Sequence, residues 1–174
     1  MMQPLLTRDQ IAQRVAEMGE EITRDFSGQS VILIGVLKGA SIFLGDLARQ
    51  IKLHATFDFV AVSSYGSAQH SSGEVRLVKD VTTPLEDRNV IVVEDILDTG
   101  LTLKFLKQLF SARKPRTLKT AALLDKTSKR AVPVEGDYVG FRIPDKFVVG
   151  YGLDYDEQYR NLPDICVLGN GTLK

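Results

Sequence analysis

The sequence contains short, continuous apolar runs that alternate with amphipathic segments. Val31–Val36 (VILIGV), Asn89–Val93 and Thr117–Leu124 are too short for ordinary helices and contain many β-branched residues. Such runs are typical of strands buried on both faces of a parallel sheet. Helical periodicity is found before the first run and between the others, over residues 8–25, 41–51 and about 101–113. The sequence therefore predicts an α/β fold with a mainly parallel sheet flanked by helices.

The two ends of the chain have a different pattern. Thr7 and Gln10 have the spacing of a helix capping box. After Asp137, short apolar pieces (YVGF, FVVGYGL, ICVLG) are interrupted by Pro144 and Pro163, which predicts a small β-rich hood lobe. We expect one domain over 1–174, with its core at about 25–135 and the hood formed by N-terminal residues and about 136–174.

Charge and cysteine content exclude several classes of partner. The 22 basic and 22 acidic residues cancel, so no overall field attracts nucleic acid or an anionic membrane. The first residues lack the apolar core of a signal peptide, and no run is long enough to span a bilayer. Cys166 is the single cysteine and cannot form a disulfide within the chain. These features predict a cytoplasmic protein that acts on small molecules.

The segment Val90–Leu103 (VIVVEDILDTGLTL) predicts a phosphate site. Ligands of open parallel sheets bind beyond the carboxyl ends of the strands, and here a helix begins directly after such an end. Its first N–H groups and its dipole favour an anion, Gly100 permits close approach, and Thr99 and Thr102 offer hydroxyl donors. The loop can hold a phosphate without a lysine.

Three carboxylates in the same segment require a second explanation, because they would repel a phosphate. Glu94 and Asp95, just beyond a buried strand, can accept hydrogen bonds from the 2′- and 3′-hydroxyls of a ribose. A structural alternative is a solvated Glu94-Asp95 loop with Asp98 as an ordinary helix cap. Asp-Thr-Gly also occurs in aspartic proteases, but their strand-rich chains do not match this alternation. We favour a site for a ribose 5′-phosphate.

The array VVEDILDTGLTL resembles the signature of type I phosphoribosyltransferases, and flanking motifs resemble the hypoxanthine(-guanine) phosphoribosyltransferase family. The similarity extends from about Val31 to Leu168, with its motifs in the expected order. The flanking motifs are VLKGA at Val36–Ala40, SSYGS at Ser63–Ser67, LLDKT at Leu123–Thr127 and IPDKFVVGYGLDYDEQYRNL at Ile143–Leu162. The resemblance implies purine salvage from 5-phosphoribosyl pyrophosphate and a 6-oxopurine, with Mg²⁺ as cofactor and a homodimer or homotetramer as the assembly.

The resemblance assigns the ribosyl half of the site to the signature. Asp98 would act as general base or acid at purine N7, because a carboxylate beside phosphate tends to have a raised proton affinity. The ribose and 5′-phosphate would lie against the whole run, which comprises Glu94, Asp95, Ile96, Leu97, Asp98, Thr99, Gly100 and Thr102.

The resemblance places the purine between a lysine and an aromatic residue. Lys126 would donate to the exocyclic O6, which favours a 6-oxo base and disfavours adenine. Phe147 would stack on the base, and the Val148 backbone would read its Watson–Crick edge. Without the resemblance, Lys126 would be interpreted as a solvated side chain and Phe147 as a core residue.

The leaving group would be held by residues from three segments. Lys38-Gly39 resembles the pyrophosphate loop, in which family members have a non-proline cis peptide before the lysine, and Arg160 would contact pyrophosphate. Asp154 would border the purine and, with Glu94 and Asp95, hold Mg²⁺ through substrate oxygens and water. An exposed Arg160–Asp154 surface pair is the structural alternative.

The polar segment between Ser64 and Gly73 predicts a mobile loop. Ser64-Tyr65 resembles the family lid, which would exclude water from a ribosyl cation; an unstructured loop without such a role is the alternative. A regulator that keeps the fold and binds the donor without catalysis is the competing function. We favour an enzyme, because candidates for the metal aspartate, the lid and the stacking aromatic are all present. The sequence leaves open the preference among hypoxanthine, guanine and xanthine.

Overall fold

A computed structural model of the protein describes residues 2–65 and 74–169. Within these residues, six strands form the central sheet in the order β4-β3-β2-β5-β6-β7. All neighbouring pairs are parallel except β3 and β4, which are antiparallel. The strands are β2 (Val31–Leu37), β3 (Ala55–Tyr65), β4 (Glu74–Lys79), β5 (Asn89–Leu97), β6 (Thr117–Asp125) and β7 (Tyr138–Arg142). The predicted mainly parallel α/β architecture is confirmed.

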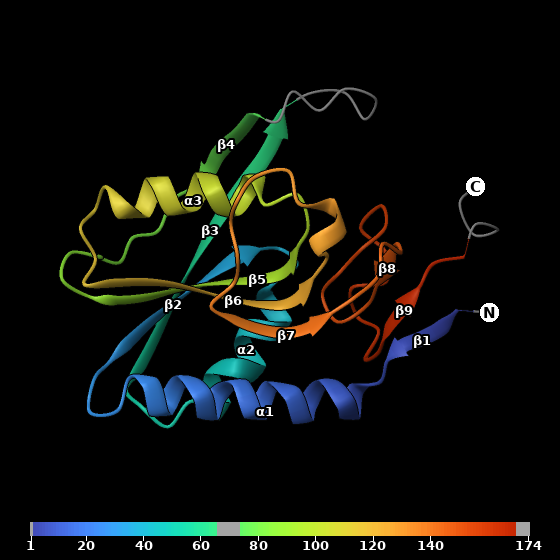
Figure 1. Ribbon diagram of the computed structural model, residues 1–174, viewed down its shortest axis with the longest axis horizontal. Coiled ribbons are helices and arrows are strands. Elements are labelled where there is room, and N and C mark those ends of the chain that lie inside the picture. The colour runs from blue at the N-terminus through green and yellow to red at the C-terminus, as the bar shows by residue number, and fades with distance from the viewer. Residues whose placement is uncertain (1, 66–73, 170–174) are drawn as a thin grey trace.

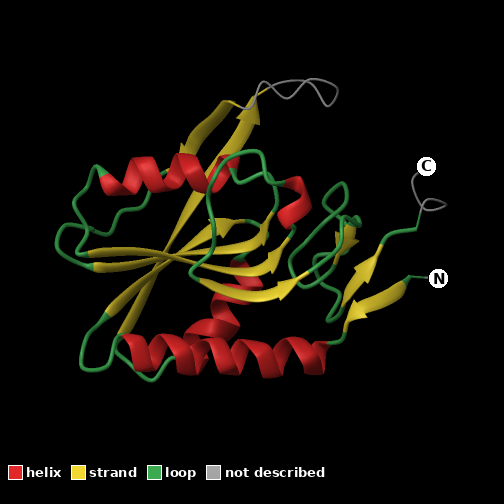
Figure 2. Ribbon diagram, in the orientation of Figure 1, coloured by secondary structure: helices red, strands yellow, loops and turns green. Residues whose placement is uncertain are grey.

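Helices cover both faces of this sheet, as Figure 2 shows in red. Figure 1 shows α1 and α2 on one face and α3 on the other. Apolar side chains of α1 and α2 pack with one set of strand residues, and those of α3 pack with the alternate set. The helices are α1 (Arg8–Asp25), α2 (Ser41–Gln50) and α3 (Leu101–Ser111), and a short 3₁₀ turn, η1 (Thr127–Lys129), follows β6. None of the helices in the described ranges is long and apolar enough to cross a membrane.

The central strand β5 is buried on both faces, as its continuous apolar run predicts. Val90–Val93 have no exposed surface, and β5 pairs with β2 on one side and β6 on the other. The strand continues through Glu94 and Asp95 to Leu97, four residues beyond the predicted end at Val93. The two acids therefore occupy strand positions and do not lie in a solvated loop.

The first helix begins as its sequence predicts. The Thr7 hydroxyl accepts a hydrogen bond from the Gln10 backbone N–H at 3.3 Å, and the Gln10 amide oxygen accepts one from the Thr7 N–H at 2.9 Å. These reciprocal bonds form the predicted capping box.

The small lobe is an antiparallel sheet in the order β1-β9-β8, formed by β1 (Gln3–Leu6), β9 (Ile165–Val167) and β8 (Val148–Val149) within the described residues. It lies beyond the carboxyl ends of β6 and β7 (Figure 1). The YVGF piece differs from the expectation, because it forms β7 and pairs in parallel with β6 in the central sheet. Its neighbour β6 lies in the main core, so the piece extends that core and does not belong to the hood.

Candidate functional site

The predicted site residues gather at one edge of the central sheet. Strands β2, β3, β5 and β6 are parallel, so their carboxyl ends meet there. Lys38-Gly39 follow β2, Ser64 and Tyr65 end β3, and Lys126 follows β6. Each segment therefore reaches the same edge as the acids of β5.

The turn from β5 into α3 is built around Gly100. Gly100 is the N-cap of α3 and has φ +84, a left-handed conformation that favours glycine. A Cβ here would approach the side chain of Val134 to 2.5 Å. Asp98 is exposed and does not cap the helix; its Oδ1 accepts a hydrogen bond from the Thr99 N–H at 2.6 Å. The interpretation of Asp98 as a helix cap is therefore wrong.

A cavity of about 230 Å³ brings the predicted ribose and phosphate residues together. Its lining includes the acids and the helix start, namely Glu94, Asp95, Ile96, Leu97, Asp98, Gly100 and Thr102, together with Ser64 from β3. A neighbouring cavity of about 290 Å³ is bordered by Ser64, Asp98, Thr99 and Thr102. The end of β3 thus borders the predicted phosphate side of the site.

Glu94 and Asp95 are carboxyl groups in a poorly solvated position. Burial raises the pKa of Glu94 well above its usual range, and the negative charges of Asp95 and Asp98 raise it further. Burial also raises the pKa of Asp95, to about 6, although the hydrogen bond from the Ile96 N–H at 2.7 Å and the charge of Arg160 oppose the shift. Such groups favour partners that donate hydrogen bonds or carry positive charge.

The loop after β2 lies directly against Asp95. The Leu37–Lys38 peptide bond is cis, as the resemblance implies. Gly39 is buried, and a Cβ at this position would lie 1.7 Å from Asp95 Oδ2. With the Asp95 carboxyl group placed as it is, position 39 has room only for glycine.

Lys38 and Arg160 meet at one carboxylate, Glu157. Lys38 Nζ lies 2.7 Å from Glu157 Oε2, and Arg160 Nη2 lies 3.0 Å from Oε1. The hydrogen bonds from Lys38 and Arg160 lower the pKa of Glu157. Arg160 Nε is buried without a hydrogen-bond partner among the described residues. The arrangement brings two cations together and leaves a buried donor available for an anion.

Asp154 belongs to the same cluster. Its Oδ1 lies 3.2 Å from Arg160 Nη2, and its Oδ2 accepts a hydrogen bond from the Glu157 N–H at 2.9 Å. Both side chains of the Arg160–Asp154 pair are mostly buried, at 26% and 31% exposure. The pair is therefore not the exposed surface pair of the structural alternative.

The predicted stacking residue Phe147 is 51% exposed, so its interpretation as a core residue is wrong. Its ring meets Tyr155 edge to face, with the ring centroids 5.8 Å apart. Val148 next to it is buried and pairs with Val167 of β9, which fixes the backbone after Phe147. The Phe147 side chain is therefore accessible, while the backbone next to it is held by the small sheet.

Lys126 is tied to the signature through the main chain. Its N–H donates to the Leu97 carbonyl at 2.9 Å, and Arg130 Nε donates to the Asp98 carbonyl at 3.1 Å. Arg130 also forms a buried ion pair with Asp125 at the end of β6. These bonds fix the start of the lysine segment relative to Asp98.

Three further residues of the site were not predicted from the sequence. Glu157, Tyr155 and Arg130 contact predicted residues through the long-range geometry described above. The predicted lid is described only in part: Ser64 lines both cavities, the Tyr65 backbone ends β3, and residues 66–73 lie outside the described residues.

Within residues 2–65 and 74–169, no group of three or more His, Cys, Asp or Glu side chains forms a cage for a metal ion. Mg²⁺ commonly binds one or two carboxylates and completes its coordination with water and substrate oxygens. The carboxyl groups of Glu94, which is buried, and of Asp95 and Asp154, which are partly buried, have the chemistry for that limited role.

Comparisons with known proteins agree with this geometry. The family model described as the phosphoribosyl transferase domain matches residues 3–156. The chain is 48% identical over 164 residues to the hypoxanthine-guanine phosphoribosyltransferase of Bacillus subtilis, covering 94% of this chain and 91% of that protein. The crystal structure of a hypoxanthine phosphoribosyltransferase from Staphylococcus aureus matches with a TM-score of 0.95 and 43% identity, covering 99% and 94% of the two chains.

A hypoxanthine-guanine phosphoribosyltransferase from Bacillus anthracis matches with a TM-score of 0.92 and 47% identity, over 96% of this chain and 98% of that one. The chain therefore belongs to the phosphoribosyltransferases and, within them, to the hypoxanthine-guanine phosphoribosyltransferase family.

Proposed function

We propose that this protein transfers the 5-phosphoribosyl group from 5-phosphoribosyl pyrophosphate to hypoxanthine, and also to guanine, with release of pyrophosphate. The products are IMP and GMP, the nucleotides of purine salvage. The observation that carries the proposal is the cavity in which Glu94, Asp95 and Asp98 face the start of α3. This set combines acceptors for a ribose diol with donors for a phosphate.

The donor's 5′-phosphate binds the turn from Asp98 to Thr102. Backbone N–H groups at the start of α3 and the hydroxyls of Thr99 and Thr102 donate to its oxygens. The carboxyl groups of Glu94 and Asp95 accept hydrogen bonds from the 2′- and 3′-hydroxyls. Because both are held by the central strand, they fix the ribose relative to the phosphate.

The pyrophosphate binds on the side of Lys38, Gly39 and Arg160. The two cations are already adjacent because Glu157 holds both, and the pyrophosphate oxygens take over these contacts. Arg160 Nε supplies the additional buried donor. When bound, Mg²⁺ neutralises charge on the leaving pyrophosphate, and Asp154, Glu94 and Asp95 are the residues that would hold it.

The purine binds between Phe147 and Lys126. Phe147 stacks on the ring, the Val148 backbone reads its edge, and Lys126 donates to O6. As the bond from ribose C1 to the pyrophosphate oxygen breaks, purine N9 forms the new bond to C1. Asp98 exchanges the purine's proton at N7, so that the nucleotide product is neutral at the ring.

The end of β3 closes over this centre. Ser64 already borders both parts of the cavity, and Ser64-Tyr65 lead into the segment assigned to the lid. Water that reached the ribosyl cation would hydrolyse the donor, so closure protects the transfer.

Initial rates with hypoxanthine, guanine, xanthine and adenine test this function at fixed donor and Mg²⁺. We expect formation of IMP and GMP, and a kcat/KM for adenine that is lower by about 10³-fold or more, because its amino group would face Lys126 without an acceptor. Binding of the donor without any nucleotide formation would instead identify a regulator. Fast adenine turnover would contradict the role of Lys126.

We also propose a cytoplasmic location and a homodimer or homotetramer. Cys166 is the single cysteine of the chain and a free, buried thiol, so the fold uses no internal disulfide, which is the usual condition of proteins in a reducing compartment. Size-exclusion chromatography with light scattering measures the assembly, and a monomer at micromolar concentration would contradict this part of the proposal.

A further inference from the structure

Tyr151 lies in an unusual stretch of backbone within the hood segment, which we define as residues 147–160. Gly150, Tyr151 and Gly152 all have positive φ, at +100, +50 and +99. The glycines are required by close contacts: a Cβ at Gly150 would lie 2.0 Å from the Asp164 carbonyl oxygen, and one at Gly152 would lie 2.1 Å from that of Gly39. Tyr151 has no such conformational freedom, so its side chain must account for its presence there.

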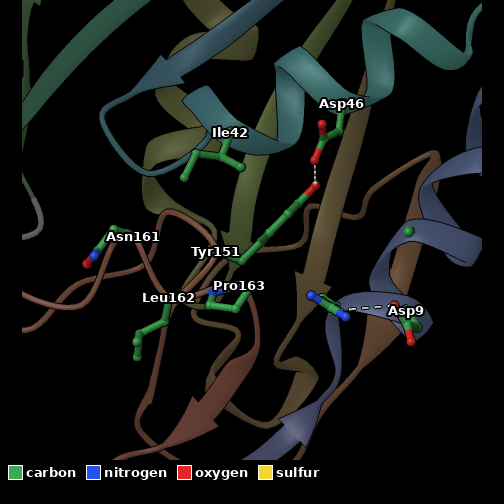
Figure 3. Close-up of a pocket in the computed structure, with 9 residues that line it drawn as sticks. Asp9, Ile42, Asp46, Tyr151, Asn161, Leu162 and Pro163 are labelled. Atoms are coloured by element: carbon green, nitrogen blue, oxygen red, sulfur yellow. Dashed lines mark hydrogen bonds and ion pairs between the residues drawn. The ribbon is translucent and has the colours of Figure 1, made fainter.

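The Tyr151 side chain crosses from the hood segment to helix α2. Figure 3 shows the ring extending toward the helix, where its hydroxyl donates to Asp46 Oδ2 at 2.5 Å. Tyr151 is 8% exposed, and its bond to Asp46 borders a cavity of about 370 Å³ between α2, the start of α1 and the hood. Burial and the bond to Asp46 both raise the pKa of Tyr151. The contact is thus a short, poorly solvated bond to a carboxylate.

This bond joins the two parts of the site that hold different substrates. Helix α2 begins two residues after Gly39, so Asp46 is rigidly connected to the pyrophosphate loop. On the other side, Tyr151 stands between Phe147 and Asp154, and its neighbour Gly152 accepts a hydrogen bond from Arg160 Nη1 at 2.7 Å. A shift of Tyr151 would therefore move the purine side relative to the pyrophosphate side.

We propose that Tyr151 is a positioning residue whose hydrogen bond to Asp46 sets the separation between the pyrophosphate loop (Lys38-Gly39) and the purine-binding hood segment. This inference rests on the proposed transferase function. Neither Tyr151 nor Asp46 contacts the reacting atoms in this scheme. Their bond aligns the leaving group with the incoming base, so it matters most when both are bound.

Tyr151→Phe is the direct test, because it removes the hydroxyl and keeps the ring. We expect kcat for IMP formation to fall about tenfold, since a small misalignment of two bound reactants lowers the rate without much change in the binding of each. The KM for 5-phosphoribosyl pyrophosphate should change less than about threefold, as the donor's ribose and 5′-phosphate contacts are untouched.

Tyr138→Phe is the matched control. Tyr138 is also a buried tyrosine with a raised pKa, and its hydroxyl donates to a helix carboxylate, Asp25 Oδ2, at 2.8 Å. It joins β7 to α1, away from the proposed machinery. Both variants should lower the melting temperature, but only Tyr151→Phe should lower kcat. Equal losses of kcat in both would overturn the positioning role and identify a general loss of stability.

Asp46 provides an independent arm of the experiment. Asp46→Ala should reproduce the loss of kcat, and Asp46→Ala combined with Tyr151→Phe should lose no more kcat than either alone, because both variants remove the same Tyr151–Asp46 bond. Asp46→Ala also removes the surface ion pair with Arg49, so Arg49→Ala is its control and should keep its kcat. Asp46→Asn keeps an acceptor oxygen and should retain about a third of wild-type kcat or more. If Tyr151→Phe does not fold, Asp46→Ala against Tyr138→Phe decides the question.

The outcomes separate this inference from the function on which it rests. A wild-type protein that forms no IMP would overturn both. A wild-type protein that turns over normally, with a Tyr151→Phe kcat within twofold of it, would overturn the positioning role alone and leave the transferase function intact.

Discussion

The signature segment, residues 90–103, and the hood segment, residues 147–160, both contribute to the site but are held in different ways. The signature segment continues a strand that pairs on both sides and then starts a helix. The hood segment contains the two-residue strand β8 and several residues with positive φ, among them Tyr151, Asp156, Glu157 and Tyr159. Regular structure holds the first, and individual long-range contacts hold the second.

This difference predicts whether a substitution in each region changes catalytic activity alone or both activity and stability. In the signature segment, a reactive side chain can change while the strand and helix remain. In the hood segment, the backbone follows the contacts of its side chains and glycines, so a change there disturbs both stability and activity. One substitution in each region tests this contrast, and variants outside both regions serve as references.

The largest expected effect is in the signature segment. Asp98→Asn should lower kcat by about 10²–10⁴-fold, because an amide cannot exchange the purine's proton. Asp98 is exposed and does not cap α3, so the melting temperature and donor affinity should change little. Steady-state kinetics and thermal unfolding measure these quantities. An unchanged kcat would remove Asp98 from the mechanism, and a large loss of stability would contradict the contrast between the regions.

Gly152→Ala tests the hood segment. Its Cβ would meet the Gly39 carbonyl at 2.1 Å in a backbone with φ +99, so we expect a loss of about 1–3 kcal/mol in unfolding free energy. Gly39 would be displaced as well, and turnover should fall. Chemical denaturation and initial rates measure the two effects.

Gly28→Ala serves as the control for Gly152→Ala. Gly28 also has positive φ, at +75, but a Cβ there meets nothing within 4 Å. This variant should lose some stability, by about 1 kcal/mol, and keep its kcat. If Gly152→Ala behaved in the same way, the hood segment would not depend on the close approach to Gly39.

A further expected effect, on stability alone, concerns a carboxylate outside both regions. Asp58 accepts hydrogen bonds from the Thr82 and Thr83 N–H groups at 2.8 and 3.0 Å. Burial raises the pKa of Asp58, but these and related hydrogen bonds outweigh that effect and lower the pKa to about 2. The ionised form is favoured by folding, so its contribution is present above pH 4 and is lost as the pH falls through about 2. With allowance for solvent screening, we expect about 1–2 kcal/mol.

Unfolding of wild type and Asp58→Asn at pH 7 and pH 3 measures this contribution. The stability difference between the two should be full at pH 7 and smaller at pH 3, with kcat at pH 7 unchanged. Asp87→Asn removes the exposed partner of Arg116 and should show a smaller difference at pH 7. A pH-independent difference for Asp58→Asn would rule out ionisation as its cause.

The sequence predicted the regular part of the molecule well because periodicity and capping are local. The strand at Val31, the helix from Arg8 and the turn at Gly100 could all be predicted from neighbouring residues. The edge strand β4 (Glu74–Lys79) was not predicted, because most of its side chains are exposed and do not form a buried strand pattern. The partner of β7 was also not predicted, since its pairing with β6 depends on distant residues.

The candidate site divides in the same way. The acids and threonines of the signature lie within one short segment and could be predicted from their order. Glu157, in contrast, is 119 residues from Lys38, which it joins to Arg160. Positive φ at Glu157 and Tyr159 brings these groups together, and non-glycine residues give no local signal for that conformation. The resemblance supplied roles for Lys126, Phe147 and Asp154, but not the contacts that hold them.

The complete burial of Val90–Val93 has a consequence for the timing of motion in this protein. Amide hydrogens in a central strand that is hydrogen-bonded on both sides exchange only during the rarest openings of a fold. Glu94 and Asp95 continue that strand, so the groups proposed to hold the ribose are attached to the segment that opens last. Surrounding loops can therefore open and close many times while the ribose position stays the same.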